Sequence, residues 1–206
     1  MKIEFFHDVL CAWAYTFSPR MRSIVKQYPE IEVIHRAFAL APEKNSISDM
    51  FGSKESGRRE ILNHWRAANE NDDEHRIRAD LMEKRGFDYP YSMPGLMACK
   101  SAEMIGGQNA HWDYFDRVQM AHLTEARNIA DDNVLLDCAM DVGLDMERFR
   151  NDFKSDRAKN AVLSDMQRAY ALGVNASPTI VVDGRYKMSG AQKYGTLKTF
   201  IEEFLI

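Results

Sequence analysis

The opening forty residues combine two short apolar runs with an intervening stretch of helical spacing. Residues 3–7 and 31–34 are rich in aromatic and β-branched side chains, which is typical of buried strands. Between them, residues 13–28 repeat apolar side chains at helical intervals and are followed by Pro29, which predicts a helix that ends there. Two strands joined through one helix usually lie parallel in one sheet. The opening segment is therefore predicted to form a βαβ unit.

The middle of the chain, from about residue 48 to residue 156, shows helical periodicity and no convincing strand. Residues 54–85 contain sixteen charged side chains, eight of each sign, and few apolar ones, which predicts a solvated helix or helix pair. Gly106 and Gly107 interrupt the apolar pattern that follows and predict a break between two helices. Further helices are predicted over residues 96–105, 112–122 and 131–141, and another one is capped by Asp145.

The last fifty residues return to a mixed pattern. A helix is predicted over residues 158–172, with Gly173 at its end. It is followed by a strand at 178–182, a hairpin turn at Asp183-Gly184, a return strand at 185–188 and a helix at 196–205. The simplest packing of this order is an α/β domain of residues 1–44 and 157–206, into which residues 45–156 insert an all-helical domain.

Composition and charge narrow the class of protein. Of 206 residues, 45% are apolar and 28% are charged, with a formal net charge of -4, which is typical of a soluble globular protein and argues against disorder. General nucleic-acid binding needs clustered positive charge and is not expected. No apolar run approaches the ~20 residues of a membrane span, and no secretory signal precedes the first strand. A cytoplasmic location is therefore expected.

Three cysteines, Cys11, Cys99 and Cys138, are too few and too far apart for a disulfide scaffold. The chain contains neither a CxxC pair nor an HExxH motif, so no metal site is expected. Cys11 stands at the start of the first predicted helix, where unpaired N–H groups and the helix dipole favour a thiolate. This position predicts a nucleophile with a pKa below the ~8.5 of a free thiol. The alternative is a small, buried apolar residue.

Several segments carry a resemblance to a known family. They are residues 6–13, 38–42 and 173–179, the last of which continues into 183–186 and 189–192. The chain resembles the thioredoxin superfamily, whose signature joins a helix-start cysteine to a cis-proline loop. More closely, it resembles the DsbA-like, FrnE-type branch, in which a helical domain interrupts that fold. The resemblance implies an α/β, thioredoxin-like fold with an inserted all-helical domain.

The resemblance implies a role for each matching residue. Cys11 would be the nucleophile, Pro178 the cis-proline beside it, and the Ser177 backbone a partner for an extended substrate or glutathione. Trp13 would lie at the mouth of the site, or else cap the core with a large apolar ring. The family's second cysteine, three residues after the first, is Ala14 here, so this pair closes no disulfide. Ala14 is either a natural residue or an engineered replacement, and the sequence leaves both open.

Three further residues are candidates for the site or for the core. Cys99 begins a helix that faces the active site in this family, so it is either a resolving or substrate-binding thiol or a packing residue. Cys138 lies on an apolar helical stripe and is predicted to belong to the core. His7, four residues before Cys11, would either stabilise its thiolate or be half-buried at the end of a strand.

The predicted function is thiol–disulfide exchange by Cys11 on protein or small-molecule thiols and disulfides. It needs no metal or nucleotide, and glutathione is a candidate co-substrate. A first alternative is a glutathione-dependent enzyme of the 2-hydroxychromene-2-carboxylate isomerase or kappa-transferase type, although those relatives commonly carry Ser at the position of Cys11. A second alternative is a non-catalytic protein that binds a peptide in its cleft. A monomer or a homodimer is expected, without nucleic-acid or membrane partners.

Overall fold

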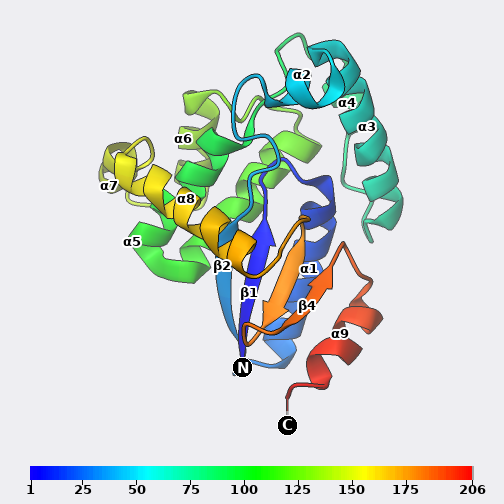
Figure 1. Cartoon of the computed structure of the whole chain (residues 1–206). Coiled ribbons are helices and arrows are strands. Elements are labelled where there is room, and N and C mark those ends of the chain that lie inside the picture. The colour runs from blue at the N-terminus through cyan, green and yellow to red at the C-terminus, as the bar shows by residue number, and fades with distance from the viewer. Residues whose placement is uncertain (206) are drawn as a thin grey trace.

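A sheet of four strands lies at the centre of the molecule. The computed structural model describes residues 1–205, and its strands are β1 (Lys2–His7), β2 (Glu32–Ala37), β3 (Thr179–Val182) and β4 (Tyr186–Ser189). Their order is β2-β1-β3-β4, with β1 parallel to β2 and antiparallel to β3, and β3 antiparallel to β4. This mixed sheet (Figure 1) contains both the predicted βαβ unit and the predicted hairpin.

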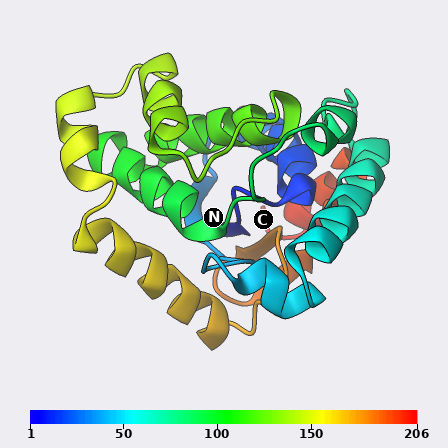
Figure 2. The ribbon, with the colours of Figure 1, turned by 90° about the horizontal axis from the view of Figure 1, so that it is seen from above.

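The helices fall into three groups along the chain. α1 joins β1 to β2, the helices α2 to α7 follow, and α8 and α9 flank the hairpin. Their bounds are α1 (Ala12–Gln27), α2 (Ser46–Phe51), α3 (Lys54–Asn71), α4 (Ala79–Glu83), α5 (Ser92–Gln119), α6 (Asp132–Asp141), α7 (Met146–Asp152), α8 (Asp156–Ala171) and α9 (Tyr194–Glu202), with a π-helical turn η1 (Met120–Thr124). Seen from above, α2 and α3 lie on one side of α1 and α5 to α7 on the other (Figure 2).

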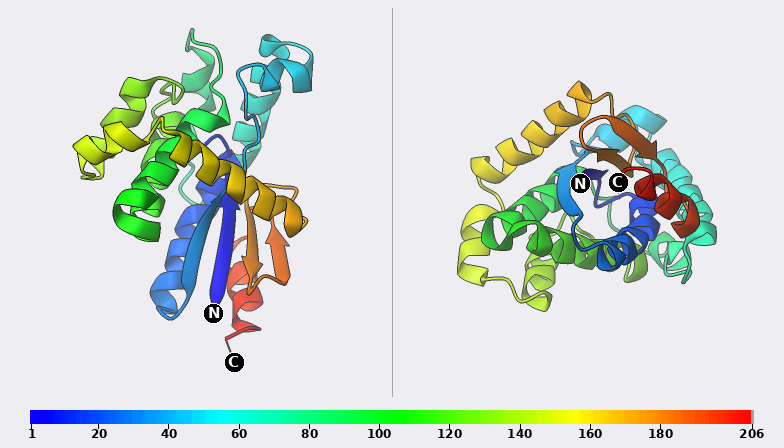
Figure 3. Two further views of the ribbon diagram at one scale, coloured as in Figure 1. Left: turned by 60° about the vertical axis from the view of Figure 1, so that its left-hand side comes forward. Right: turned by 90° about the horizontal axis from the view of Figure 1, so that it is seen from below.

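Helices cover both faces of the sheet because successive residues of β1 point to opposite sides. Phe5 packs with Phe17 of α1 at a ring-centroid distance of 5.6 Å, and Leu197 of α9 belongs to the same hydrophobic cluster. On the other face, Phe6 packs with Ala169 of α8. Figure 3 shows α8 crossing one face of the sheet while α1 lies against the opposite face.

The long helix α5 is bent where the sequence predicts a break. Gly106 (φ −136°, ψ 18°) and Gly107 (φ 70°, ψ −159°) both leave the helical conformation, and glycine adopts the positive φ without a steric penalty. The two helices predicted over residues 96–105 and 112–122 are therefore the two arms of α5, and the second continues into η1. In α9 the prediction was less accurate, because the helix begins at Tyr194 rather than at residue 196.

One hydrophobic cluster runs from the sheet into the middle of the chain. It contains Phe5 and Phe17 together with Phe115 of α5 and Phe149 of α7. The predicted border between the α/β domain and the helical insertion thus crosses a continuous core, and its position near residues 44 and 156 stays a prediction. Within residues 1–205, no helix combines the length and the apolar character that a bilayer crossing requires.

Candidate active site around Cys11

Cys11 caps the start of α1, directly after the loop that follows β1. Its backbone is extended (φ −78°, ψ 105°), and its carbonyl accepts the N–H groups of Ala14 and Tyr15 at 3.1 and 3.2 Å. Its thiol donates to the carbonyl oxygen of Ser177, with 3.2 Å between Sγ and O. The residue is 5% exposed. The predicted position of Cys11 at a helix start is therefore confirmed.

The loop that carries Ser177 is fixed to the neighbouring strand. The Ser177–Pro178 peptide bond is cis. The Pro178 carbonyl accepts the Gly190 N–H at 2.8 Å, and the Thr179 hydroxyl bonds to the serine hydroxyl at the end of β4. These contacts hold the Ser177 carbonyl beside Cys11, although the two segments lie at opposite ends of the sequence.

Asp8 is a site residue that the sequence reasoning did not single out. Its carboxylate is fully buried and accepts the Leu10 N–H at 3.0 Å on one oxygen. The other oxygen accepts the Leu40 N–H and the Ser92 hydroxyl, each at 2.6 Å. Burial raises the pKa of Asp8. The sequence offers one indication of this role, because Asp8 lies three residues before Cys11 within residues 6–13, which carry the family resemblance.

Gln119 also escaped the sequence reasoning. Its side-chain amide, at the end of α5, donates to the Cys11 carbonyl at 2.9 Å and to the Asp8 carbonyl at 3.2 Å. Both acceptors are backbone atoms of the loop that ends in the nucleophile. Gln119 is therefore a positioning residue that fixes this loop to the helical part of the chain.

The pKa of Cys11 moves in the direction opposite to the one predicted from sequence. Burial is the largest cause and the Asp8 carboxylate adds to it, so that the pKa rises to about 11. The backbone N–H groups of Trp13 and Ala14 lower the pKa but are outweighed. The prediction of a pKa below that of a free thiol is wrong for this closed site, because helix-start amides do not replace the water lost around the sulfur.

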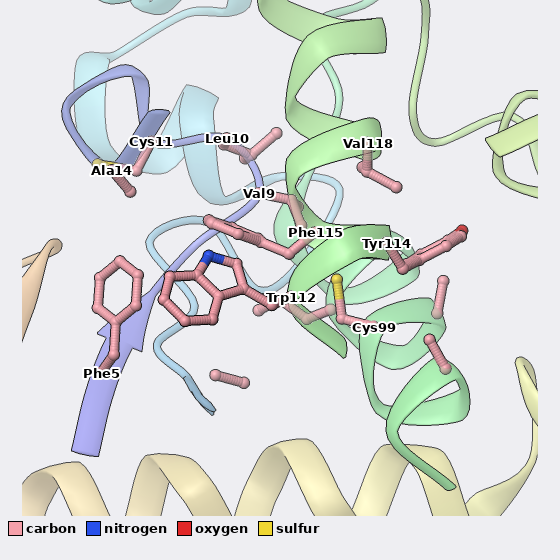
Figure 4. Packing of buried hydrophobic residues seen from close by; sticks show 14 of the residues in the cluster. Phe5, Val9, Leu10, Cys11, Ala14, Cys99, Trp112, Tyr114, Phe115 and Val118 are labelled. Carbon is pink, nitrogen blue, oxygen red and sulfur yellow. The ribbon is translucent and has the colours of Figure 1, made fainter. Parts of the chain in front are cut away.

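A cavity of about 340 Å³ opens beside the Cys11 thiol. Trp13 lines it and is half-buried, so the ring serves both the site and the core beneath. Ala14 is fully buried in the hydrophobic cluster next to Cys11 (Figure 4). The remaining walls include Ile47, Met50, Phe51, Ile61, His64 and Trp65, all from α2 and α3.

The structure does not bring Cys99 to this cavity. Its side chain is fully buried in α5, in the hydrophobic cluster that also contains Trp112 and Tyr114 (Figure 4). Burial raises the pKa of Cys99 well above that of an ordinary thiol. The geometry supports a packing role, and the predicted resolving or substrate-binding role is not supported. Cys138 is buried in the same cluster, as predicted, and all three cysteines are free thiols.

His7 points into a cluster of histidines rather than to Cys11. Its Nε2 lies 3.0 Å from Nδ1 of His35, and its ring lies 3.8 Å from the ring of Phe115, centroid to centroid. The His111 ring stacks on His35 at 4.9 Å. Burial lowers the pKa of all three histidines. His7 is therefore a neutral core residue, and the predicted role in stabilising the Cys11 thiolate is not supported.

The histidine cluster does not fit a metal ion as it stands. Ring nitrogens of His7, His35 and His111 come within 4.8 Å of one another, and neutral imidazole is a common metal ligand. A metal ion lies in the plane of each ring that binds it. The rings of His35 and His111 are stacked with only 23° between their planes, and His7 already bonds to His35. While this hydrogen bond is kept, the other nitrogens of His7 and His35 are one lone pair and one N–H, so the three rings do not offer three lone pairs to an ion.

Comparisons with known proteins agree with this architecture. Residues 2–202 match the family model described as DSBA-like thioredoxin domain. The ClpXP adapter protein SpxH of Bacillus subtilis (strain 168) is 31% identical over 126 residues, which cover 57% of this chain and 42% of that protein. The match thus spans less than half of that relative. SpxH of Halalkalibacterium halodurans is 27% identical over 213 residues, covering 100% of this chain and 68% of the relative.

Three solved structures share the fold. A candidate protein disulfide isomerase from Nitrosomonas europaea gives a TM-score of 0.81 at 22% identity, covering 99% of this chain and 97% of that one. The cytosolic disulfide reductase DsbM from Pseudomonas aeruginosa, in a structure with GSH, gives 0.76 at 21% identity, covering 100% and 99%. A 2-hydroxychromene-2-carboxylate isomerase gives 0.71 at 14% identity, covering 98% and 95%. The predicted thioredoxin-like α/β fold with a helical insertion is confirmed.

Proposed function

Because the chain belongs to the DSBA-like thioredoxin domain family, we propose that it is a thiol–disulfide oxidoreductase with Cys11 as its nucleophile. The observation that carries the proposal is the position of Cys11 at the start of α1, 3.2 Å from the Ser177 carbonyl and next to a cavity. An extended disulfide substrate lying along the Ser177–Pro178 segment would bond to the Ser177 backbone, whose carbonyl the Cys11 thiol releases when it reacts, and would bring its sulfurs to Cys11.

In the first step Cys11 attacks one sulfur of a substrate R–S–S–R. The bond between Cys11 and that sulfur forms, the original disulfide bond breaks, and R–SH leaves with the proton that Cys11 loses. In a chain with cysteine at position 14, that second thiol would resolve the mixed disulfide. Ala14 offers no thiol, so an external thiol must attack. This second exchange restores the Cys11 thiol and transfers R–S to the external thiol.

Glutathione is our candidate for the external thiol. A relative with the same fold, DsbM, has been crystallised with GSH. Because that relative is described as a cytosolic disulfide reductase, we place the reaction in the cytosol. No metal or nucleotide takes part in either exchange step. Whether the protein acts as a monomer or a homodimer stays a prediction.

The proposal is tested with 4,4′-dithiodipyridine at about pH 9, near the ordinary thiol pKa. Each thiol that attacks this reagent releases one coloured thiopyridone. The protein should release one thiopyridone and keep the other as a mixed disulfide, visible by intact mass, whereas Cys11→Ser should release none. Equal reaction of Cys11→Ser and the unmodified chain would overturn the proposal.

Ala14→Cys extends the same experiment. Residues three apart at a helix start fall within the Cα separation of ~4.4–6.8 Å that a disulfide needs. This variant should release two thiopyridones, carry none, and lose two hydrogens as the internal disulfide closes. If the unmodified chain also loses two hydrogens, Cys99 or Cys138 supplies the resolving thiol and the single-thiol scheme is wrong.

A second candidate is the glutathione-dependent isomerase or transferase. Ala14 favours it, because a single residue suffices to activate glutathione, and a 2-hydroxychromene-2-carboxylate isomerase shares the fold. In this case Cys11 would orient the glutathione thiol without forming a disulfide. Cys11→Ser should then retain glutathione-dependent turnover, whereas the oxidoreductase loses all activity with this change.

A third candidate is a non-catalytic binding protein. The raised pKa of Cys11 favours it, as does the likeness to SpxH, which is described as a ClpXP adapter protein. A chain that binds a peptide while Cys11 stays inert toward dithiodipyridine would support this candidate over the other two.

A further inference from the structure

We propose that the substrate group bound beside Cys11 is uncharged and apolar, of about the size of an aromatic ring, with at most one neutral hydrogen-bond acceptor. The inference rests on the proposed function and names the class of substrate for the same site. It starts from the cavity of about 340 Å³, whose walls are mostly aliphatic and aromatic. That volume lies within the range of small-molecule sites.

The cavity offers no counterpart for a charged ligand. Among the described residues that line it there is no Lys, Arg, Asp or Glu, and His64 is an exposed residue of α3. A carboxylate entering these surroundings would lose its hydration and gain no ion pair. Glutathione carries two carboxylates, so it does not match the cavity. It would instead approach the finished mixed disulfide from the solvent side, as the second thiol.

Two buried polar groups in the lining have no hydrogen-bond partner among the described residues. They are the Trp65 indole N–H and the Ser177 hydroxyl. The Tyr89 hydroxyl, a further polar group of the lining, lies 3.0 Å from Nε2 of His122. A buried donor without an acceptor is unfavourable. A ligand with one neutral acceptor, such as a carbonyl oxygen or ring nitrogen, would satisfy such a donor without bringing a charge.

The residues around the opening are also apolar. Leu40 is 39% exposed and Met50 is 54% exposed, although both line the cavity. Large apolar side chains left in water next to a cavity are typical of a binding site. They extend the apolar wall outward, so a substrate meets apolar surface before it reaches Cys11.

Three disulfides that differ in charge test the inference. They are neutral 4,4′-dithiodipyridine, dianionic 5,5′-dithiobis(2-nitrobenzoate) and oxidised glutathione. Each rate constant with the protein is divided by the rate constant of the same reagent with free cysteine, which removes the intrinsic reactivity of the reagent. We expect the neutral reagent to exceed both charged ones by about tenfold or more on this scale.

The outcomes separate the substrate class from the proposed function. If a charged reagent equals or exceeds the neutral one, the apolar substrate class is overturned, while Cys11 remains an exchanging thiol. If Cys11 reacts with none of the three, both proposals are overturned.

A pair of variants isolates the cavity from the overall charge. Met50→Lys places a cation at the opening and should reduce the preference for the neutral over the dianionic reagent by about threefold. Met140→Lys adds the same charge at a methionine that is 52% exposed on α6 and does not line the cavity. It should leave the preference unchanged, and an equal effect of both variants would count against the inference.

Discussion

The Cys11 thiol donates a hydrogen bond to the Ser177 carbonyl, which lies 3.2 Å away and 166 residues further along the chain. This contact closes the sulfur between the start of α1 and the loop before β3. It positions the nucleophile where a substrate strand can lie, and the same closure leaves Cys11 only 5% exposed. Reactivity and burial are therefore set by one arrangement, and changes in pH or in neighbouring residues should alter both.

Alkylation of Cys11 by iodoacetamide should accelerate with pH up to an inflection at about 11, rather than near the ordinary 9.0. Only the thiolate reacts, and burial keeps the thiol protonated. Because the unfolded chain releases this proton more readily, stability should also decline as pH rises above 9.0. Circular dichroism at each pH therefore accompanies the mass measurement, with Cys11→Ser as the blank. A rate that levels off below pH 9.0 while the chain stays folded contradicts this prediction.

Gly95→Ala should lower the free energy of unfolding by about 1–3 kcal/mol. The added methyl group would lie 2.7 Å from Cγ2 of Val9, a buried side chain in the loop before Cys11. Gly195→Ala, in the exposed first turn of α9, meets nothing within 4 Å and should raise stability by up to about 1 kcal/mol. Urea unfolding measures both variants, and a Gly95→Ala variant as stable as the unmodified chain would show that α5 tolerates the extra methyl.

Much of the fold was predictable because the helices and strands depend on residues that are close together in the sequence. The short apolar run at residues 3–7 identifies β1, and the Gly106-Gly107 pair identifies the bend in α5. The start of α9 was misplaced because its N-cap residue, Lys193, makes no side-chain cap, so no capping signal marks the boundary. Where the sequence contains a local signal, the predicted boundary of an element agrees with the structure. Where it contains none, the predicted boundary is displaced by a residue or two.

Residues of the site were predictable only where they belong to a sequence motif. Cys11 and Ser177 come from segments that the family resemblance identifies. Side chains such as Met50 and Trp65 reach the cavity through tertiary packing, which no spacing along the chain reveals. The sign of the pKa shift was missed for the same reason, because burial of a helix-start thiol depends on distant segments such as the loop at Ser177.

The free energy of unfolding should fall as pH decreases from 6.5 toward 5. Burial lowers the pKa of His7, His35 and His111 in the folded chain, so these three histidines bind protons in this range mainly when the chain is unfolded. Each histidine contributes at most about 1.4 kcal/mol per pH unit. His7→Phe should reduce the slope of stability against pH relative to the unmodified chain. Unfolding in urea at three pH values measures the slopes, and identical slopes would contradict the prediction.

Asp8→Asn should make Cys11 more acidic while making the fold less stable. The Asp8 carboxylate raises the pKa of Cys11, so its loss should shift the alkylation inflection below about 11. The three groups that donate to Asp8 would then face an amide, which has one acceptor oxygen where the carboxylate has two. The free energy of unfolding should therefore fall by about 1–3 kcal/mol.

Ser92→Ala separates the charge of Asp8 from its hydrogen bonds. It removes the hydroxyl that lies 2.6 Å from the Asp8 carboxylate and keeps the carboxylate itself. Both variants should therefore unfold at lower urea concentration, but only Asp8→Asn should lower the pH at which Cys11 alkylation is half-maximal. A purely structural role for Asp8 predicts the same pH profile in the two variants. That result would remove Asp8 from the residues that control the nucleophile.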